Sequence, residues 1–157
     1  MNHLEQSEQQ AYILGAMFVL ANRLQSLGDK LDEQLSTKQW LVIAAILKSG
    51  LEAPALTELA GMIGTSRQNL KKLLLILEKR GFVSLAPDGS DARILRVRLT
   101  GKCGEYFAGR SKREEQFMKN LFQSFGPEQT DGLYRGLALL TANISRMESQ
   151  LTYEEEE

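Results

Sequence analysis

The sequence predicts a mainly α fold with a small antiparallel β wing: a winged helix-turn-helix lobe with terminal helices that form a dimerisation region. The first observation is the order of elements after residue 66. A basic helix over 67–80 stops at Gly81, and a short strand over 82–85, a turn at 87–89 and a second strand within 91–100 follow. The second observation is a concentration of cations over this stretch. The third is a pair of apolar helical seams near the two ends of the chain. A helix followed by a two-stranded wing is typical of DNA-binding architecture.

The composition is that of one soluble globular domain. The chain has 157 residues, of which 43% are hydrophobic and 25% charged, enough to bury roughly two-thirds of the unfolded surface. The single cysteine, Cys103, cannot form an internal disulfide. No apolar run approaches the ~20 residues of a membrane span, and residues 1–10 are too polar for a signal peptide. We therefore expect a cytoplasmic protein that does not contact a membrane.

Charge is unevenly distributed along the chain. Residues 66–113 contain twelve Lys and Arg against four Asp and Glu, a net charge of +8, which leaves −9 on the rest of a chain whose total is −1. A basic island between acidic flanks is typical of a protein that presents one face to phosphates. Charge alone favours the simpler interpretation of a solvated surface, and the neighbouring motifs favour a nucleic-acid partner.

Apolar side chains recur with alternating steps of four and three near both ends of the chain. The first seam is Ile13, Met17, Leu20, Leu24, Leu27 and Leu31, and the second is Leu133, Leu137, Leu140, Ile144, Met147 and Leu151. This is the spacing of helices that pack against other helices. The two helices could pack within one chain, but they carry more apolar surface than a small winged lobe needs, which favours a homodimer. Three glycines, Gly28, Gly132 and Gly136, weaken the pattern because each lowers helix propensity by up to ~1 kcal/mol relative to Ala.

These patterns predict three regions: an N-terminal dimerisation helix over 1–35, a winged-helix lobe over 36–100, and a long linker helix with a C-terminal dimerisation helix over 101–157. In the lobe, the capping box Ser36-Thr37-Lys38-Gln39 opens a helix that runs to about residue 48. Its apolar residues are expected to be mostly core: Trp40, Leu41, Ile43, Ala44 and Leu47. A short helix over 56–63 ends at Gly64, and Ser66 caps the next helix.

That next helix, over 67–80, has one apolar and one cationic face. At ~100° per residue, Leu70, Leu73, Leu74 and Leu77 cluster on one side and Gln68, Lys71, Lys72 and Lys79 on the other. Such a helix can rest on a core and enter the major groove. Gln68 and Asn69 can pair with adenine and Arg67 with guanine, while Lys71 and Lys72 can reach guanine or phosphate. The predicted recognition set is Ser66, Arg67, Gln68, Asn69, Lys71 and Lys72.

Three motifs together resemble the MarR family of winged-helix regulators. They are Leu59-Ala60 followed by Gly64-Thr65-Ser66-Arg67, then Leu77-Glu78-Lys79-Arg80-Gly81-Phe82-Val83, then a D-x-R-x-x-x-V-x-L-T string formed by Asp91, Arg93, Val97, Leu99 and Thr100. The resemblance extends over nearly the whole chain, because that family also has dimerising terminal helices and a long helix after the wing. It implies that Asp91 supports the wing by pairing with a basic side chain, here Arg93, Arg96 or Arg98, and that Arg93 enters the minor groove. The predicted wing contacts are Asp91, Arg93 and Arg96. A narrow minor groove attracts Arg, which fits this assignment.

The chain departs from that family at three positions. Ala55 stands where a capping hydroxyl residue is common, so the helix over 56–63 is expected to start loosely. Leu75 and Ile76 stand where polar residues are usual. We expect them to pack in the core against the helix after the wing; the alternative is an apolar contact with a partner protein or with thymine methyl groups.

The sequence predicts no catalytic residues, no metal site and no cofactor. The only histidine is His3, and no Cys and His residues have metal-ligand spacing. Cys103 follows Lys102 in the first turn of a predicted helix, which could lower its pKa and suit a redox sensor. The interpretation of Cys103 as a small buried hydrophobe is favoured.

The predicted function is that of a homodimeric transcriptional regulator that binds a pseudo-palindromic site on double-stranded DNA, most simply as a repressor. The resemblance also implies a pocket for a small aromatic effector, with Tyr12, Trp40 and Phe107 as apolar walls and Arg110 as an anion partner. The alternative is a dimeric protein-interaction module with weak or no specific DNA binding, for which Leu75, Ile76 and the acidic residues 154–157 are the reasons.

Overall fold

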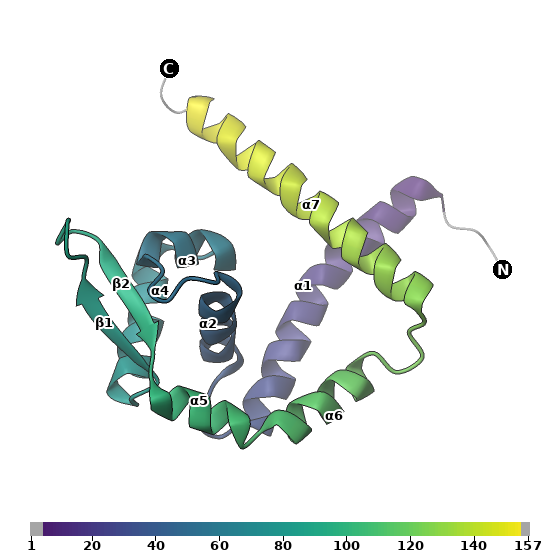
Figure 1. Ribbon diagram of the computed structural model, residues 1–157. Coiled ribbons are helices and arrows are strands. Elements are labelled where there is room, and N and C mark those ends of the chain that lie inside the picture. Colours follow the sequence, from purple (N-terminus) through teal and green to yellow (C-terminus); the bar gives the residue numbers. More distant parts are fainter. Residues whose placement is uncertain (1–4, 155–157) are drawn as a thin grey trace. The chain divides into compact units, whose positions relative to one another are not determined.

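The computed structural model describes residues 5–154 and divides them between two compact units, one ending at Gly109 and one beginning at Arg110. His3 and residues 155–157 of the acidic tail lie outside the described residues. The first unit contains α1 (Gln6–Leu31), α2 (Thr37–Lys48), α3 (Leu56–Ile63), α4 (Arg67–Lys79), β1 (Val83–Pro87), β2 (Leu95–Leu99) and α5 (Gly101–Ala108). The second contains α6 (Ser111–Leu121) and α7 (Pro127–Glu154). Figure 1 shows these elements in chain order. The predicted fold class, mainly α with an antiparallel wing, is confirmed.

Local signals set the boundaries of the lobe's helices as predicted. The Ser36 hydroxyl accepts from the Gln39 amide (3.2 Å), and the Gln39 side chain accepts from the Ser36 amide (3.0 Å), so the capping box at the start of α2 is complete. α3 ends at Gly64, whose φ of 70° lies in the left-handed region that favours glycine. The Ser66 hydroxyl then accepts from the amide of Asn69 and caps α4.

The wing is a two-stranded antiparallel sheet with Val83 opposite Leu99 and Pro87 opposite Leu95. A third segment joins it from the loop before α3: the Val97 amide donates to the Pro54 carbonyl (3.1 Å), and Ala55 forms a bridge with Arg96. The wing is therefore anchored to the helical lobe through backbone hydrogen bonds.

One core holds the lobe together. Leu70, Leu74 and Leu77 of α4 are fully buried, as the wheel predicts, and pack in a cluster with residues of α2, α3 and both strands. The core prediction for α2 was mostly wrong. Trp40, Leu41 and Leu47 are 42–63% exposed, and Ile43 is buried together with Val42, Ala45 and Ile46. Because α2 is apolar on nearly every face, periodicity could not identify its inner side.

Two further expectations need correction. The single long helix expected after the wing is two helices, α5 and α6, separated at Gly109 and Arg110. Leu75 and Ile76 were expected to pack in the core, but they are 49% and 43% exposed. Within residues 5–154, no helix is long and apolar enough to cross a membrane.

α1 is fastened at its C-terminal end to the rest of the first unit. The Thr37 hydroxyl donates to the Gln25 carbonyl (3.1 Å), and the Thr37 amide donates to Asp29 (2.7 Å). The Tyr106 hydroxyl of α5 lies 2.6 and 2.7 Å from the two carboxylate oxygens of Asp32. These contacts connect the C-terminal end of α1 to α2, and the residue that follows α1 to α5. α1 itself contains no buried residue.

Candidate nucleic-acid interface

The first turns of α4 present a polar, cationic surface to solvent. Arg67, Gln68, Asn69, Lys71 and Lys72 are all exposed. The cap at Ser66 fixes the direction in which this end of the helix leaves the α3–α4 turn, and the buried leucines on the opposite face hold it against the core. The predicted recognition residues of α4 are therefore all accessible to solvent.

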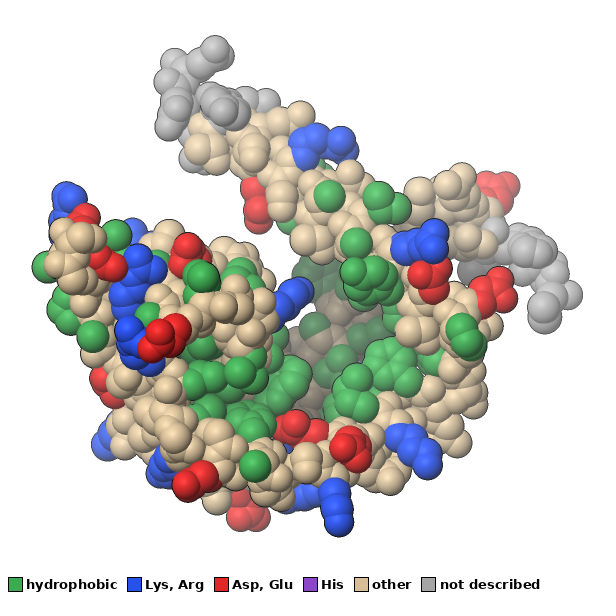
Figure 2. Space-filling view, in the orientation of Figure 1, with side chains coloured by type: hydrophobic (Ala, Val, Ile, Leu, Met, Phe, Trp, Pro, Cys, Tyr) green, Lys and Arg blue, Asp and Glu red, His purple; other side chains and the backbone are tan. Residues whose placement is uncertain are grey.

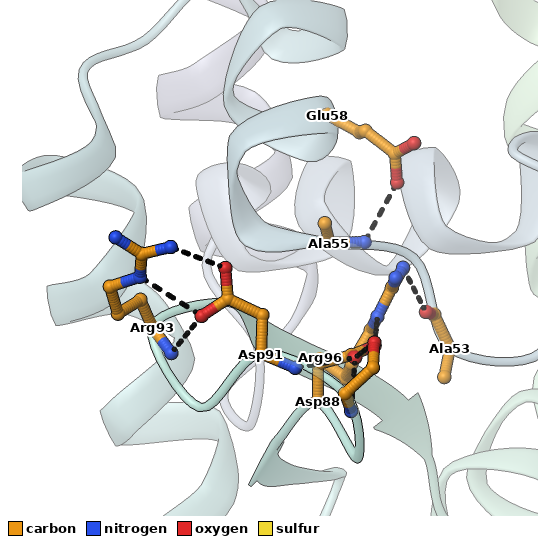
Figure 3. Close-up of polar contacts among 8 residues, drawn as sticks. Ala53, Ala55, Glu58, Asp88, Asp91, Arg93 and Arg96 are labelled. Atoms are coloured by element: carbon orange, nitrogen blue, oxygen red, sulfur yellow. Dashed lines mark hydrogen bonds and ion pairs between the residues drawn. The ribbon is translucent and has the colours of Figure 1, made fainter.

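The wing loop over 88–94 carries an ion pair at its tip. Arg93 donates from Nε to one carboxylate oxygen of Asp91 and from Nη2 to the other, each at 3.0 Å (Figure 3). The same carboxylate accepts from the Arg93 backbone amide at 3.0 Å. The arginine side chain remains 90% exposed. Hydrogen bonds from the Arg93 side chain and then from its amide lower the pKa of Asp91. Of the three arginines expected as partners of Asp91, the structure selects Arg93.

A second carboxylate, that of Asp88, organises the start of the wing loop. One of its oxygens accepts from the Ser90 hydroxyl (2.7 Å) and the Ser90 amide (2.9 Å), and the other accepts from Arg96 Nε (2.7 Å). These contacts hold the pKa of Asp88 well below its usual range, with the Ser90 hydroxyl making the largest contribution. This role of Asp88 was not predicted, because the sequence indicated only a turn at 87–89. The signal for it is an Asp placed two residues before a Ser, which forms an Asx-type turn.

Arg96, predicted to contact DNA, has partners within the protein. Besides Asp88, its guanidinium donates to the carbonyl of Ala53 (3.3 Å), in the loop before α3 (Figure 3). Its side chain is about one-third exposed. Arg98 is likewise paired, with Glu52 of the same loop. The two arginines of β2 therefore hold the wing to the lobe, and Arg93 is left as the outward cation at the wing tip.

The start of α3 is better ordered than the sequence suggested. Ala55 offers no side-chain cap, but the Glu58 carboxylate accepts from the Ala55 amide at 2.8 Å (Figure 3). This is half of a capping box, supplied by the residue three positions into the helix. The helix that supports the α3–α4 turn is therefore capped in spite of the missing hydroxyl.

Helix and wing flank one open hollow of about 650 Å³. Its lining comes from α3, α4 and the wing loop: Leu56, Thr57, Arg67, Gln68, Lys71, Arg93, Ile94 and Leu95. Figure 2 shows Lys and Arg side chains at the wing tip and along the wing side of the lobe. The hollow thus brings three predicted recognition residues and the principal wing residue to one concave, cationic surface.

Other predicted site residues are not brought together in this way. Tyr12 is 72% and Trp40 43% exposed, and Phe107 packs edge-on against Tyr106 beside the core. Arg110 begins the second unit. The hollow between α4 and the wing is not lined by any of the four. The effector pocket stays a prediction.

The thiol of Cys103 is buried, and this burial raises its pKa. The neighbouring Lys102 ammonium donates to the Arg80 carbonyl (2.6 Å) and lies over the Phe82 ring. The structure therefore contradicts a lowered pKa at Cys103 and favours its role as a small hydrophobe. Among residues 5–154, no group of three or more His, Cys, Asp or Glu side chains could hold a metal ion.

Comparison with known proteins identifies relatives of this arrangement. No protein-family model matches the chain. An uncharacterized HTH-type transcriptional regulator of Bacillus subtilis, YfiV, is 24% identical over 149 residues, which are 95% of this chain and 92% of that protein. A solved MarR protein from Peptoclostridium difficile shares the fold with a TM-score of 0.77 at 20% identity, over 94% of this chain and 96% of that one.

Two other solved structures with this fold are each described with a named binding partner. A mutant MarR from E. coli complexed with operator DNA has a TM-score of 0.67 at 18% identity, over 83% of this chain and 95% of that one. Bordetella bronchiseptica BpsR, whose structure addresses regulation of DNA binding by 6-hydroxynicotinic acid, has a TM-score of 0.67 at 18% identity. The match covers 82% of this chain and 98% of that one. These solved structures share the winged-helix fold of this chain.

Proposed function

We propose that this chain, which has the winged-helix fold of MarR-type regulators, is a homodimeric, sequence-specific DNA-binding transcriptional regulator. The observation that carries the proposal is the hollow shared by Gln68 and Lys71 of α4 and Arg93 of the wing. A phosphate backbone separates the major groove of a duplex from the adjacent minor groove. If α4 enters the major groove and the wing enters the minor groove, the phosphate backbone between the two grooves lies in the hollow.

Each flank of the hollow has chemistry that suits its groove. Gln68 can donate to and accept from the edge of adenine, and Arg67 can donate twice to guanine. Lys71 and Lys72 add charge at the phosphates. Arg93 stands on a thin loop and is 90% exposed, which suits insertion into a narrow minor groove.

The apolar surface of the two long helices supports dimerisation. α1 contains no buried residue, although residues 11–21 include no charged or strongly polar side chain. In α7, Leu137, Ile144 and Met147 are 46–60% exposed. Packing these surfaces against those of a second copy would remove them from water. In this proposal 1–35 and the later part of 101–157 form the dimer, and 36–100 forms each DNA-binding lobe.

A symmetric dimer would present two α4 helices to a pseudo-palindromic operator with half-sites about one helical turn apart. Repression by occupying a promoter is the simplest output of such binding. We further propose that a small aromatic effector relieves it, on the analogy of BpsR and 6-hydroxynicotinic acid. An effector acts only if it binds the DNA-competent and DNA-incompetent dimers with different affinities.

A second candidate is a protein-interaction module, which the exposure of Leu75 and Ile76 favours. The experiment that separates the two uses the full chain. It is incubated with a pool of random duplexes, bound fragments are amplified and sequenced, and the enriched duplex is tested by gel shift at several salt concentrations. We expect an inverted repeat whose affinity falls steeply with salt. Failure to enrich any sequence, together with no shift at low salt, would favour the protein-interaction module.

A further inference from the structure

Leu75 is an exposed leucine in a cationic setting. It lies on the outer face of α4 and is 49% exposed, while the core face is formed by the fully buried Leu70, Leu74 and Leu77. A helical wheel at ~100° per residue places it on the same stripe as Gln68, Lys72 and Lys79. All three of these neighbours are exposed. The stripe that is proposed to face DNA therefore has an apolar side chain in its middle.

The charge around Leu75 restricts what can cover it. Lys72 lies one turn before it and Lys79 one turn after it. Glu78, also one turn after it, accepts a hydrogen bond from the Leu85 amide (2.9 Å). A covering surface that is anionic at its edges and apolar at its centre therefore suits Leu75 and the two lysines. The major groove of DNA meets both conditions, because phosphates form its walls and the C5-methyl group of thymine projects into it. An apolar protein surface would leave the neighbouring ammonium groups without partners at the cost of their desolvation.

The length of the helix determines whether Leu75 can reach a base. At ~1.5 Å per residue, Leu75 lies about 10 Å along the helix axis from Gln68. If α4 entered the major groove end-on, Leu75 would lie outside a groove that is about 8.5 Å deep. If α4 lies along the groove, both residues face base edges and Lys79 reaches a phosphate beyond them. Leu75 is 49% exposed, so its side chain is accessible to a bound duplex.

We infer that Leu75 is a specificity-determining residue that packs on a thymine methyl group, with α4 seated lengthwise in the major groove. This inference rests on the proposed DNA-binding function and adds a base preference to it. It predicts that each half-site contains a thymine that is read through its methyl group, several base pairs from the base that Gln68 contacts.

The test replaces one thymine at a time by uracil, which removes only the C5-methyl group, in the duplex enriched from the random pool. Replacing one particular thymine in each half-site should lower the affinity of the wild-type dimer about four-fold, because burial of one methyl-sized group contributes about that much. With Leu75→Ala, the same replacement should change affinity much less. Leu51→Ala is the matched control, because Leu51 is 51% exposed but lies outside α4. It should keep the wild-type response.

The outcomes separate this inference from the function on which it rests. If the wild type binds the duplex tightly but no single uracil weakens it, or if Leu75→Ala responds to uracil as the wild type does, the role of Leu75 is overturned while DNA binding stands. If no duplex is bound, the proposed function itself fails. Because Leu75 is exposed, Leu75→Ala should fold normally, and circular dichroism of the variant checks this.

Discussion

Gly28 of α1 lies directly against Thr37, the first residue of α2. A Cβ built on Gly28 would clash with the Thr37 hydroxyl oxygen, which donates to the carbonyl of Gln25 in α1. The sequence presented Gly28 as a defect in an apolar seam. The structure shows instead that the glycine allows α2 to approach α1, so the N-terminal helix and the winged lobe meet where a side chain would not fit.

Gly28→Ala should therefore destabilise the protein although alanine favours helix. We expect a loss of about 1–3 kcal/mol in the free energy of unfolding, the usual cost of overpacking, measured by urea denaturation. Gly104→Ala is the control, because a Cβ on that helical glycine meets nothing within 4 Å; it should be neutral or stabilising. Adding Thr37→Ala should recover part of the loss in Gly28→Ala. A Gly28→Ala protein as stable as the control would show that the helices do not meet at this point.

Glutamates placed in the seam of α7 should break the dimer. Leu140→Glu with Ile144→Glu would bury two charges without partners, so we expect dissociation or unfolding in sedimentation velocity. Ala142→Glu with Ser149→Glu is the control on the opposite side of the same helix, where both residues are exposed. It should remain a dimer. A folded dimer from the seam variant would place the interface elsewhere.

The wing residues Asp91 and Arg93 should respond differently to alanine. Arg93→Ala removes an exposed cation and leaves the hydrogen bonds of Asp88 in place. We expect weaker operator binding, an unchanged melting temperature, and a salt slope smaller by about 0.9 for each phosphate that the variant no longer neutralises. A variant that melts earlier would mean that Arg93 stabilises the wing rather than binds DNA.

Asp91→Ala should weaken binding even though it removes a negative charge beside DNA. The carboxylate holds both the guanidinium and the backbone amide of Arg93, so its removal leaves the tip of the wing unordered. Simple electrostatics predicts the opposite sign, namely tighter binding. Operator affinity measured by fluorescence anisotropy distinguishes the two, and tighter binding by Asp91→Ala would contradict the assignment of the wing.

Acid should disorder the wing only below the ordinary range of an aspartate. The pKa of Asp88 and that of Asp91 are both lowered in the folded protein, so their contribution to stability is present above the unfolded pKa of about 3.9 and is lost as the pH falls through the folded values. Wing order should thus be constant from about pH 8 to pH 5. Carboxyl chemical shifts in NMR should give Asp88 a midpoint well below 3.9. A midpoint at or above that value would show that the hydrogen bonds from Ser90 and Arg96 do not persist in solution.

Helix boundaries and the order of elements in the wing could be predicted from the sequence, because short-range signals determine them. The caps at Ser36 and Ser66, the stop at Gly64 and the order of strands in the wing each depend on residues only a few positions apart. Recognition residues could be placed on the outer face of α4 because its leucines are confined to one side.

Features that depend on contacts across the fold could not be predicted in the same way. Arg96 was predicted to contact DNA because its hydrogen-bond partner, the carbonyl of Ala53, lies 43 residues away in the sequence. The role of Gly28 depends on where α2 crosses α1. The inner face of α2 is selected by α3, α4 and β2 from a helix that is apolar on most sides, which is why Trp40 and Leu47 were misassigned.

The affinity of the dimer for its enriched duplex, divided by its affinity for a shuffled duplex of the same composition, tests sequence-specific binding by α4 most directly. For the wild type we expect a ratio of about 10³ or more at physiological salt. Gln68→Ala should lower the ratio by a factor that corresponds to roughly 1–3 kcal/mol, with little change in affinity for the shuffled duplex. Lys72→Ala should lower the affinity for both duplexes equally. A wild-type ratio near one, or an equal decrease in affinity for both duplexes with Gln68→Ala, would contradict sequence-specific recognition by α4.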